Sequence, residues 1–407
     1  MKISFIQPSR NNLKYLKWSY DAIRKNQGNH IAEICVADDF SNDGTWGWCE
    51  EMMGKDPHFK AIRNEGPTRL GHTILYDELV NKVASHEICM IYHADMYLCP
   101  GALDAIEKHM YNVIDNGDNG ERVKNKKTIV SLTRIEPPLH PPGPEKVFLE
   151  WGATEPEDFK EEKFLKWFND TLEKGEPTEG IFAPWAFWKS DFQEIGGHDP
   201  LYAPQSKEDS DIFNRFLLNG IKFIQTWEGF VYHMTCRGSR YNPTLTIPGQ
   251  NSREWEAQNV RSTRNFIRKW GHFCKHDSLM KPIIPPKYDV GFIVSNCGLP
   301  HLEILEPWCS TIYIEDDMQL IVPDYIQKEQ SNTKFNLQER IKPYNNEKQN
   351  NILVSFDASK LNNQNIQILY QLSEIIKDSG EVGTFNLDIF TIDIIHMNEY
   401  QNQLIKL

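Results

Sequence analysis

The sequence lacks the cysteine patterns of a disulfide or zinc protein and the long apolar runs of a membrane protein. Its eight cysteines include no CxxC pair and no zinc-like spacing, which predicts reduced and mostly buried thiols. No apolar stretch approaches the roughly 20 residues that a membrane-spanning helix needs. The opening run 1–6 is also too short for a signal peptide. We therefore expect a cytoplasmic protein without an integral membrane segment, and leave peripheral contact with a membrane open.

Positive charge is also scarce. The chain has 44 Lys and Arg against 57 Asp and Glu, a net charge of -13, which argues against nucleic acid as a partner. The basic residues that do gather are Arg261, Arg264, Arg268 and Lys269, whose helical spacing predicts a solvated helix face. We find no internal repeat. Aromatic residues are abundant, with 11 Trp, and belong either to a large core or to sugar-binding surfaces.

The first 100 residues alternate strands with helices. Helical spacing covers Leu13–Asn26 and Leu70–Ala84, and another helix follows Thr45. Between them lie four apolar runs, predicted as strands: Ile3–Gln7, Ile34–Ala37, Phe59–Arg63 and Ile88–Tyr92. This order predicts a mostly parallel α/β sheet flanked by helices, with ligands beyond the carboxyl ends of the strands.

The rest of the chain divides into the end of this domain and a smaller one. Residues 1–280 form the first domain, with a helical insertion at 151–176, and residues 281–287 are a Pro-rich linker to an α/β or α+β domain at 288–407. In the first domain we expect strands at Lys124–Leu132, Ile221–Thr226 and Phe230–His233, a helix at Asp209–Leu218 and a loop at Glu136–Pro144. In the second we expect strands at Val290–Ser295, Thr311–Ile314, Asn351–Phe356 and Phe385–Ile395, a helix at Gln364–Lys377 and a loop at Gln327–Asn350.

Two adjacent carboxylates, Asp38 and Asp39, end the second strand. Paired carboxylates at a strand tip need compensating donors, which a base edge, a ribose hydroxyl or backbone amides supply. A capped turn, for which Asp43 alone suffices, is the structural alternative.

His93 and Asp95 follow the fourth strand and alternate, so both side chains are able to reach one metal ion, Mg²⁺ or Mn²⁺. A plain polar loop is the alternative. His233 also ends a predicted strand, and Arg237 and Arg240 follow it in a Gly/Ser loop. Such a group suits a diphosphate and its metal.

Glu208, Asp209 and Asp211 open a helix. Acidic residues are common in the first turn because they offset the helix dipole. The functional alternative makes Asp209 a general base toward an acceptor hydroxyl.

Together these segments resemble family 2 glycosyltransferases of the GT-A fold. The run Asp-Asp-Phe-Ser-Asn-Asp-Gly-Thr is similar to the nucleotide-binding signature of that family, and His-Ala-Asp stands where the family has its Asp-x-Asp metal motif. Residues 182–185, 195–199 and 208–211 resemble its acceptor region and Glu-Asp catalytic motif. The resemblance covers roughly residues 1–275 and leaves the C-terminal domain unassigned.

The resemblance implies roles for particular residues. Asp39, with Asp38 beside it, is implied as the nucleobase contact, and Arg69 as a further nucleotide contact. Asp209 is implied as the base of an inverting transfer. Asp95, with His93 or His233, is implied as the metal site, and Arg237 and Arg240 as diphosphate contacts. Trp185, Glu208 and Asp211 are assigned to the acceptor side, with core packing an equal alternative for Trp185.

Two departures from the family pattern matter. His93 replaces the first Asp of the metal motif, and the Gln-x-x-Arg-Trp motif of processive synthases is absent. We therefore expect a non-processive, inverting enzyme of polysaccharide biosynthesis that uses Mn²⁺ or Mg²⁺. It would transfer a sugar from a nucleotide-sugar donor, with a UDP-sugar favoured, to a glycan or other acceptor. The alternatives are a retaining transferase, a nucleotidyltransferase, and a catalytically silent protein that binds nucleotide sugars or glycans.

Overall fold

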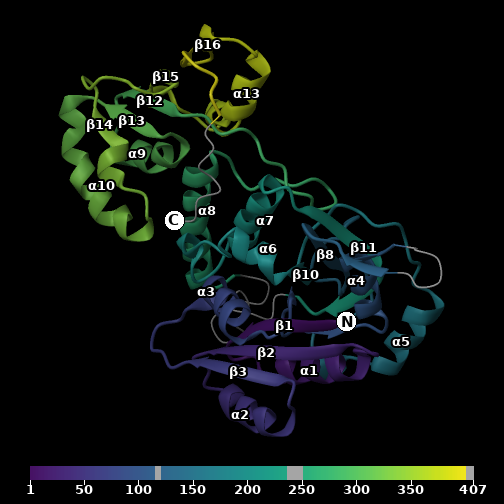
Figure 1. Ribbon diagram of the computed structural model, residues 1–407. Helices are drawn as coiled ribbons and strands as arrows, with labels where there is room; N and C mark the ends of the chain where they lie inside the picture. Colours follow the sequence, from purple (N-terminus) through teal and green to yellow (C-terminus); the bar gives the residue numbers. More distant parts are fainter. Residues whose placement is uncertain (115–120, 236–250, 400–407) are drawn as a thin grey trace. The chain divides into compact units, whose positions relative to one another are not determined.

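The computed structural model describes residues 1–114, 121–235 and 251–399 (Figure 1). It divides into two compact units. Unit 1 comprises Met1–Glu256 and His276–Pro282, and unit 2 comprises Ala257–Lys275 and Ile283–Leu407. The sequence-based boundary at residues 281–287 stays a prediction.

Unit 1 is built on a nine-stranded sheet with the order β3-β2-β1-β4-β10-β8-β11-β5, and β9 pairs with β8. Strands β1 to β4 are mutually parallel, as are β8, β9 and β11, whereas β10 and β5 run antiparallel to their neighbours. The strands of the sheet are β1 (Lys2–Ser9), β2 (Ile31–Asp39), β3 (Phe59–Asn64), β4 (Ile88–Ile91), β5 (Met96–Leu98), β8 (Thr128–Glu136), β9 (Lys146–Phe148), β10 (Trp185–Trp188) and β11 (Lys222–His233). The predicted fold class, a mostly parallel sheet flanked by helices, is confirmed.

The helices of unit 1 follow the predicted alternation. Helix α1 has the predicted bounds because its apolar positions recur at helical spacing and bury one face. The α-helices in chain order are α1 (Leu13–Asn26), α2 (Thr45–Lys55), α3 (Gly71–Glu78), α4 (Ala102–Met110), α5 (Glu161–Asp170), α6 (Lys189–Glu194) and α7 (Glu208–Leu218). A π-helical turn, Leu79–Val83, extends α3, and a two-stranded ribbon is formed by β6 (Tyr111–Ile114) and β7 (Glu121–Lys124). Over the described ranges, no helix combines the length and apolar character needed to cross a bilayer.

Two strand predictions in unit 1 need correction. The two strands predicted at 221–226 and 230–233 are one strand, β11, whose pairing with β8 shifts register between Thr226 and Phe230. Strand β8 begins at Thr128 and continues to Glu136, beyond the predicted end at Leu132. Glu136 therefore belongs to the sheet and not to the Pro-rich loop.

Unit 2 has its own six-stranded sheet with the order β14-β13-β12-β15-β17-β16. Strands β14, β13, β12 and β15 are mutually parallel. Strand β17 runs antiparallel to both of its neighbours, β15 and β16. The strands are β12 (Val290–Ser295), β13 (Thr311–Ile314), β14 (Ile341–Pro343), β15 (Ile352–Asp357), β16 (Gly383–Leu387) and β17 (Phe390–Ile394). The α-helices are α9 (Leu299–Leu305), α10 (Val322–Glu329), α11 (Leu337–Arg340), α12 (Ile366–Tyr370) and α13 (Leu372–Ser379).

Three predictions in unit 2 are wrong in detail. The single strand expected at 385–395 is a hairpin, because Asp388 takes a left-handed conformation (φ 54°) between β16 and β17. The helix expected at 364–377 is broken at Gln371 into α12 and α13. The segment 327–350 contains the end of α10, all of α11 and β14, so it is not one irregular loop.

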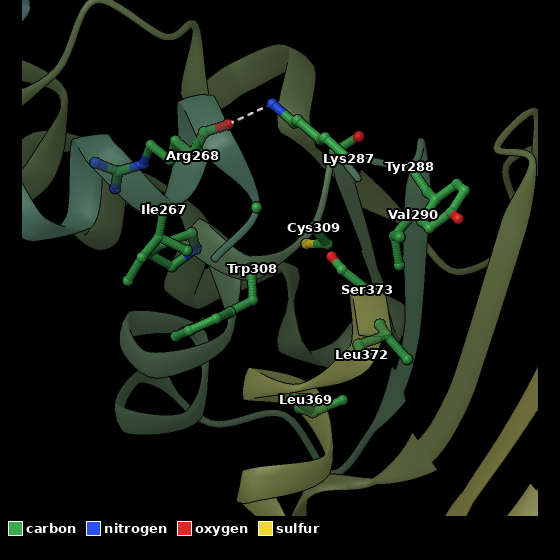
Figure 2. A pocket seen from close by; sticks show the side chains of 13 residues that line it. Ile267, Arg268, Lys287, Tyr288, Val290, Trp308, Cys309, Leu369, Leu372 and Ser373 are labelled. Carbon is green, nitrogen blue, oxygen red and sulfur yellow. Dashed lines mark hydrogen bonds between the residues drawn. The ribbon is translucent and has the colours of Figure 1, made fainter. Parts of the chain in front are cut away.

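Helix α8 (Arg253–Trp270) carries the basic cluster, whose solvated-face prediction is also wrong. Arg268 is fully buried and pairs with Glu306 at 2.6 Å and with Glu329 at 2.7 Å. Lys287 closes the end of this helix by donating a hydrogen bond at 2.7 Å to the carbonyl oxygen of Arg268 (Figure 2). It donates a second one, also at 2.7 Å, to the carbonyl oxygen of Lys269. Charged side chains thus organise the interior of unit 2 around α8.

Candidate active site

The site lies at the carboxyl edge of the sheet in unit 1. Strand β10 is antiparallel to both β4 and β8, so β4 and β8 point the same way and end at the same edge as β1 and β11. A pocket of about 300 Å³ opens there. Its lining comes from these strand ends and from α3: Pro8, Asn12, His72, Tyr76, His93, Ala94, Asp95, Arg134, Glu136, His140, Lys146, Phe182, His233 and Thr235.

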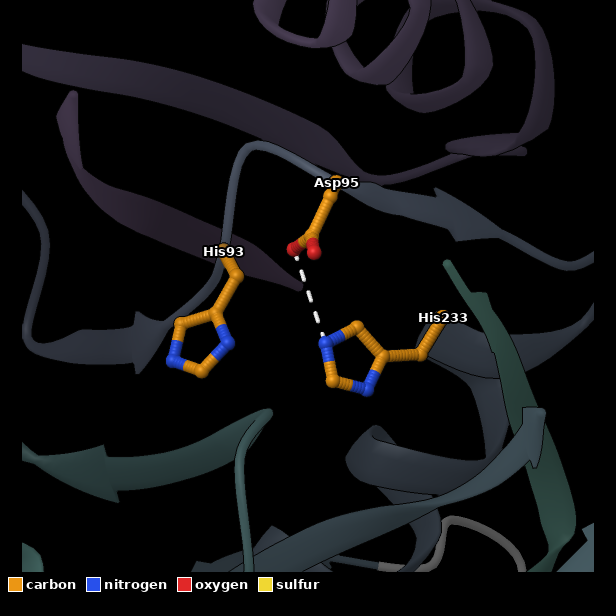
Figure 3. Close-up of side chains that lie close together, drawn as sticks. All are labelled: His93, Asp95 and His233. Atoms are coloured by element: carbon orange, nitrogen blue, oxygen red, sulfur yellow. Dashed lines mark ion pairs between the residues drawn. The ribbon is translucent and has the colours of Figure 1, made fainter. Parts of the chain in front are cut away.

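His93, Asp95 and His233 form a compact cluster in this pocket. One potential ligand atom from each lies within 4.8 Å of the others, and Nε2 of His233 is 3.5 Å from Oδ1 of Asp95 (Figure 3). Strand pairing explains the meeting, because Met96 of β5 pairs with His233 of β11 and places Asp95 beside it. Two imidazoles and one carboxylate are a common ligand set for a divalent cation, so these residues fit a metal. The structure thus brings together the three residues that the sequence predicted as metal ligands.

The charges of neighbouring residues set the protonation of the cluster. Burial opposes charge on His233, but Asp95 and Glu136 outweigh it and raise the pKa of His233 to about 9. Burial likewise opposes charge on Asp95, yet His233 and His93 lower the pKa of Asp95 to about 2. Burial lowers the pKa of His93 to about 4, which leaves its imidazole neutral and able to ligate. At neutral pH the cluster therefore holds an anionic Asp95 beside a neutral His93 and a protonated His233, whose Nε2 proton a bound cation would displace.

Glu136 lies behind His233 and was not predicted. Its Oε1 is 3.2 Å from Nδ1 of His233 and accepts a hydrogen bond from Arg134 at 2.7 Å, and its Oε2 accepts one from Lys146 at 2.9 Å. The sequence predicts a loop that begins at Glu136. A signal existed in the alternation of Arg134 and Glu136 at the end of an apolar run, which points both side chains to one face of a strand.

Two residues of α3, His72 and Tyr76, were also missed. The His72 ring stacks on His93 with centroids 6.4 Å apart. Burial, helped by His93 and Arg69, lowers the pKa of His72 to about 3, although Asp39 and Asp95 oppose the shift. The neutral His72 ring thus lies beside the predicted metal residue His93.

Asp39 is occupied by structural hydrogen bonds. Its Oδ1 accepts from the Leu70 amide at 3.0 Å and from Asn64 Nδ2 at 2.8 Å, and its Oδ2 accepts from the Gly71 amide at 2.8 Å. Arg69 approaches the same oxygen at 3.6 Å. Since a carboxylate offers about four acceptor positions, Asp39 shapes the loop that leads into α3. Its predicted contact with the nucleobase stays a prediction.

The surroundings of Asp38 and Arg69, two further residues predicted to contact the nucleotide, are also defined. Asp38 is fully buried, accepts a hydrogen bond from the Ser41 amide at 3.1 Å and lies 3.4 Å from Arg63. Arg69 donates a hydrogen bond at 2.7 Å to Gln205, which stands three residues before Glu208. Arg69 thus connects the Asp39 loop to the segment that begins α7.

Glu208 and Asp209 open α7 next to this segment. Burial and then the charge of Asp209 raise the pKa of Glu208, and burial raises the pKa of Asp209. Burial and the charges of Asp209, Glu208 and Asp95 together raise the pKa of Tyr76, which lines the pocket.

Two residues assigned to the acceptor are fully buried. Trp185 is 0% exposed and packs against Phe187, Phe213 and Phe216, so its core-packing alternative holds. Asp211 is also 0% exposed and accepts a 2.7 Å bond from Arg215 within α7, which makes it a structural residue.

Arg237 and Arg240, predicted to contact the diphosphate, lie outside the described residues.

Comparisons with known proteins agree with the resemblance. Residues 4–152 match the model of glycosyl transferase family 2, which confirms the family recognition over this part of the chain. No curated protein gives a significant match.

Solved structures similar to this chain include three glycosyltransferases at low identity. One is GalNAc-T7 with UDP, GalNAc and Mn²⁺, at 15% identity over 67% of this chain and 51% of that chain, with a TM-score of 0.45. Another is mannosyltransferase PcManGT from Pyrobaculum calidifontis with GDP-Man and Mn²⁺, at 13% identity over 64% and 61%, with a TM-score of 0.38. A third is S. aureus TarS 1-349, at 14% identity over 57% and 60%, with a TM-score of 0.37. The aligned part thus spans about half to three fifths of each of these chains.

Proposed function

We propose that this chain is a metal-dependent, inverting and non-processive glycosyltransferase that moves a sugar from a nucleotide-sugar donor to a hydroxyl of a glycan or other acceptor. One observation carries the proposal. His93, Asp95 and His233 bring ligand atoms within 4.8 Å of one another in a pocket at the carboxyl edge of the sheet, a set suited to a divalent cation. The match of residues 4–152 to family 2 supports the same assignment.

His93, Asp95 and His233 would provide ligands for the cation. When bound, the cation offsets the negative charge that develops on the departing nucleoside diphosphate. The mixed set of two imidazoles and one carboxylate favours Mn²⁺ over Mg²⁺, because Mg²⁺ prefers oxygen ligands.

Asp209 takes the role of the general base. Its burial raises its pKa, so its carboxylate holds a proton more tightly than an exposed aspartate does. Asp209 accepts the proton of the acceptor hydroxyl while the acceptor oxygen bonds to the anomeric carbon and the bond to the diphosphate breaks. Attack from the face opposite the leaving group inverts the anomeric configuration.

The proposal is tested with a panel of nucleotide sugars, beginning with UDP-sugars. Release of nucleoside diphosphate is measured with Mn²⁺, with Mg²⁺ and with a chelator, and the anomeric configuration of the product is read by NMR. We expect Mn²⁺ to support the fastest release, the chelator to stop it, and Asp209→Asn to abolish transfer while donor binding, followed by thermal shift, stays nearly intact.

Asp170→Asn, an exposed change on α5, is the matched control and should transfer at the wild-type rate. Unchanged turnover in Asp209→Asn would remove the base assignment. Donor binding without turnover in any condition would favour the catalytically silent binding protein, and retention of configuration would favour the retaining transferase.

A further inference from the structure

A buried carboxylate stands behind one member of the metal cluster. Glu136, at the end of β8, has a side chain that is 3% exposed, and its Oε1 lies 3.2 Å from Nδ1 of His233. Strands β8 and β11 are parallel neighbours, so both residues come from the sheet and not from loops. The contact uses the ring nitrogen that does not face Asp95, because Asp95 lies 3.5 Å from Nε2.

Two cations hold Glu136 in place. Arg134 donates to Oε1 at 2.7 Å and Lys146 donates to Oε2 at 2.9 Å, and their side chains are 9% and 8% exposed. Arg134 also stacks on the Phe182 ring at 4.1 Å, which restricts the guanidinium further. A carboxylate tied at both oxygens by buried partners has little freedom to turn away from His233.

The geometry points to Glu136 as the positioning residue of the metal site. It accepts the Nδ1 proton of His233, so that Nε2 is the nitrogen presented to the cation together with Asp95 and His93. A second hydrogen bond of this kind fixes the tautomer and the ring orientation of a ligating histidine. Arg134 and Lys146 hold Glu136 in turn. This inference rests on the proposed metal-dependent function.

The test measures metal affinity directly, without turnover. Mn²⁺ binding to the full-length protein is followed by the electron paramagnetic resonance signal of free Mn²⁺. We expect Glu136→Gln to weaken Mn²⁺ binding by about 10–100-fold, the usual effect of losing such a partner. Glu145→Gln is the matched control, because Glu145 lies 3.8–3.9 Å from the same two cations, and it should bind Mn²⁺ within about twofold of wild type.

Two further measurements separate positioning from general damage to the fold. In a His233→Ala background the effect of Glu136→Gln on Mn²⁺ affinity should disappear, since the effect acts through His233. Nitrogen-15 NMR of the histidine rings should show protonated Nδ1 on His233 in the wild type with bound Zn²⁺, and a loss of that single form in Glu136→Gln. If Glu136→Gln fails to fold, Glu136→Asp keeps the charge but withdraws the oxygen, and it should bind Mn²⁺ less tightly than the wild type.

Unchanged Mn²⁺ affinity in both Glu136 variants, or an equal loss in the His233→Ala background, would overturn the inference. Mn²⁺-dependent transfer by the wild type would still stand in that case. A wild-type protein that neither binds Mn²⁺ nor transfers sugar would overturn the proposed function and this inference together.

Discussion

Asp39 and Asp95 are both buried carboxylates at strand ends, yet their surroundings differ. Asp39 is met by two backbone amides, an asparagine and an arginine, which fill its acceptor positions. Asp95 faces two histidines, and those rings are themselves able to bind a cation. A buried carboxylate with unfilled acceptor positions is unstable without a partner, whereas a satisfied one is structural. At the residue scale this contrast favours Asp95 over Asp39 as a ligand of the proposed cation, while Asp39 shapes the loop.

A pH prediction belongs to Glu208. Burial and the charge of Asp209 raise the pKa of Glu208 to about 8, against an ordinary value of 4.5. Between these two pH values the folded state keeps a proton that the unfolded chain releases, so folding loses stability as pH rises through this window. Glu208→Gln has no such proton. Raising the pH from 5 to 8.5 should therefore lower the Tm of the wild type by several degrees more than the Tm of Glu208→Gln, as measured by circular dichroism.

The control for this experiment is Glu157→Gln, since the Glu157 side chain is 63% exposed. Its Tm should follow the wild-type curve at every pH. Parallel curves for Glu208→Gln and wild type would show that the burial of Glu208 does not shift its proton affinity on folding.

At the scale of elements, the start of α3 lies between the two halves of the candidate site. The Leu70 and Gly71 amides bind Asp39, and Gly71 also packs against Pro204, four residues before Glu208. A Cβ on Gly71 would lie 2.0 Å from the Pro204 carbonyl oxygen. Close contact of backbone with backbone therefore joins the predicted nucleotide loop to the segment that leads into α7.

Gly71→Ala tests this contact against a matched glycine. Gly71 and Gly101 both precede or begin a helix with positive φ (75° and 78°), but a Cβ on Gly101 meets nothing within 4 Å. Gly101→Ala should therefore lose only the cost of the left-handed backbone, about 1–2 kcal/mol of unfolding free energy in urea titrations. Gly71→Ala should lose more than Gly101→Ala, and its kcat should fall because the segment before Asp209 must move. Equal losses of stability with unchanged kcat in both variants would contradict this account.

Elements whose bounds follow from local pattern could be predicted from the sequence. Helix α1 and strands β12 and β13 occur at the predicted residues, because their apolar periodicity and their flanking polar residues lie within the segment itself. His93, Asp95 and His233 were likewise found because each stands at the end of an apolar strand.

The structural features that could not be predicted from the sequence depend on partners that are distant along the chain. Arg268 looks like a surface residue until Glu306 and Glu329 are placed beside it. Glu136 was assigned to a loop because Pro137 and Pro138 follow it, although pairing with Phe148 of β9 extends the strand to that residue. Its contact with His233 spans 97 residues and leaves no local signal beyond the alternation of Arg134 and Glu136.

At the scale of the whole molecule, the two units interleave along the chain. Helix α8 lies before the predicted linker, yet residues 257–275 pack within unit 2, where Arg268 is buried against Glu306 and Lys287 closes the helix end. A cut between residues 282 and 283 therefore divides unit 2 and does not separate it from unit 1.

This interleaving predicts the behaviour of a protein nicked at that point by an engineered protease site. The pieces 1–282 and 283–407 should remain bound and elute together in size-exclusion chromatography, because the partners of α8 lie on the second piece. Glu306→Ala should weaken their association by at least about a hundredfold, since removing one partner of a buried ion pair costs about 3–5 kcal/mol. Glu303→Ala is the matched control on α9, because Glu303 pairs with Lys328 at the surface and should change the association little.

Piece 1–282 expressed alone should lose hydrogen-exchange protection in residues 257–270 while β1 and β4 stay protected. Separation of the nicked pieces with α8 still protected would show that the helix does not need unit 2, and the division of the molecule would then lie at the linker instead.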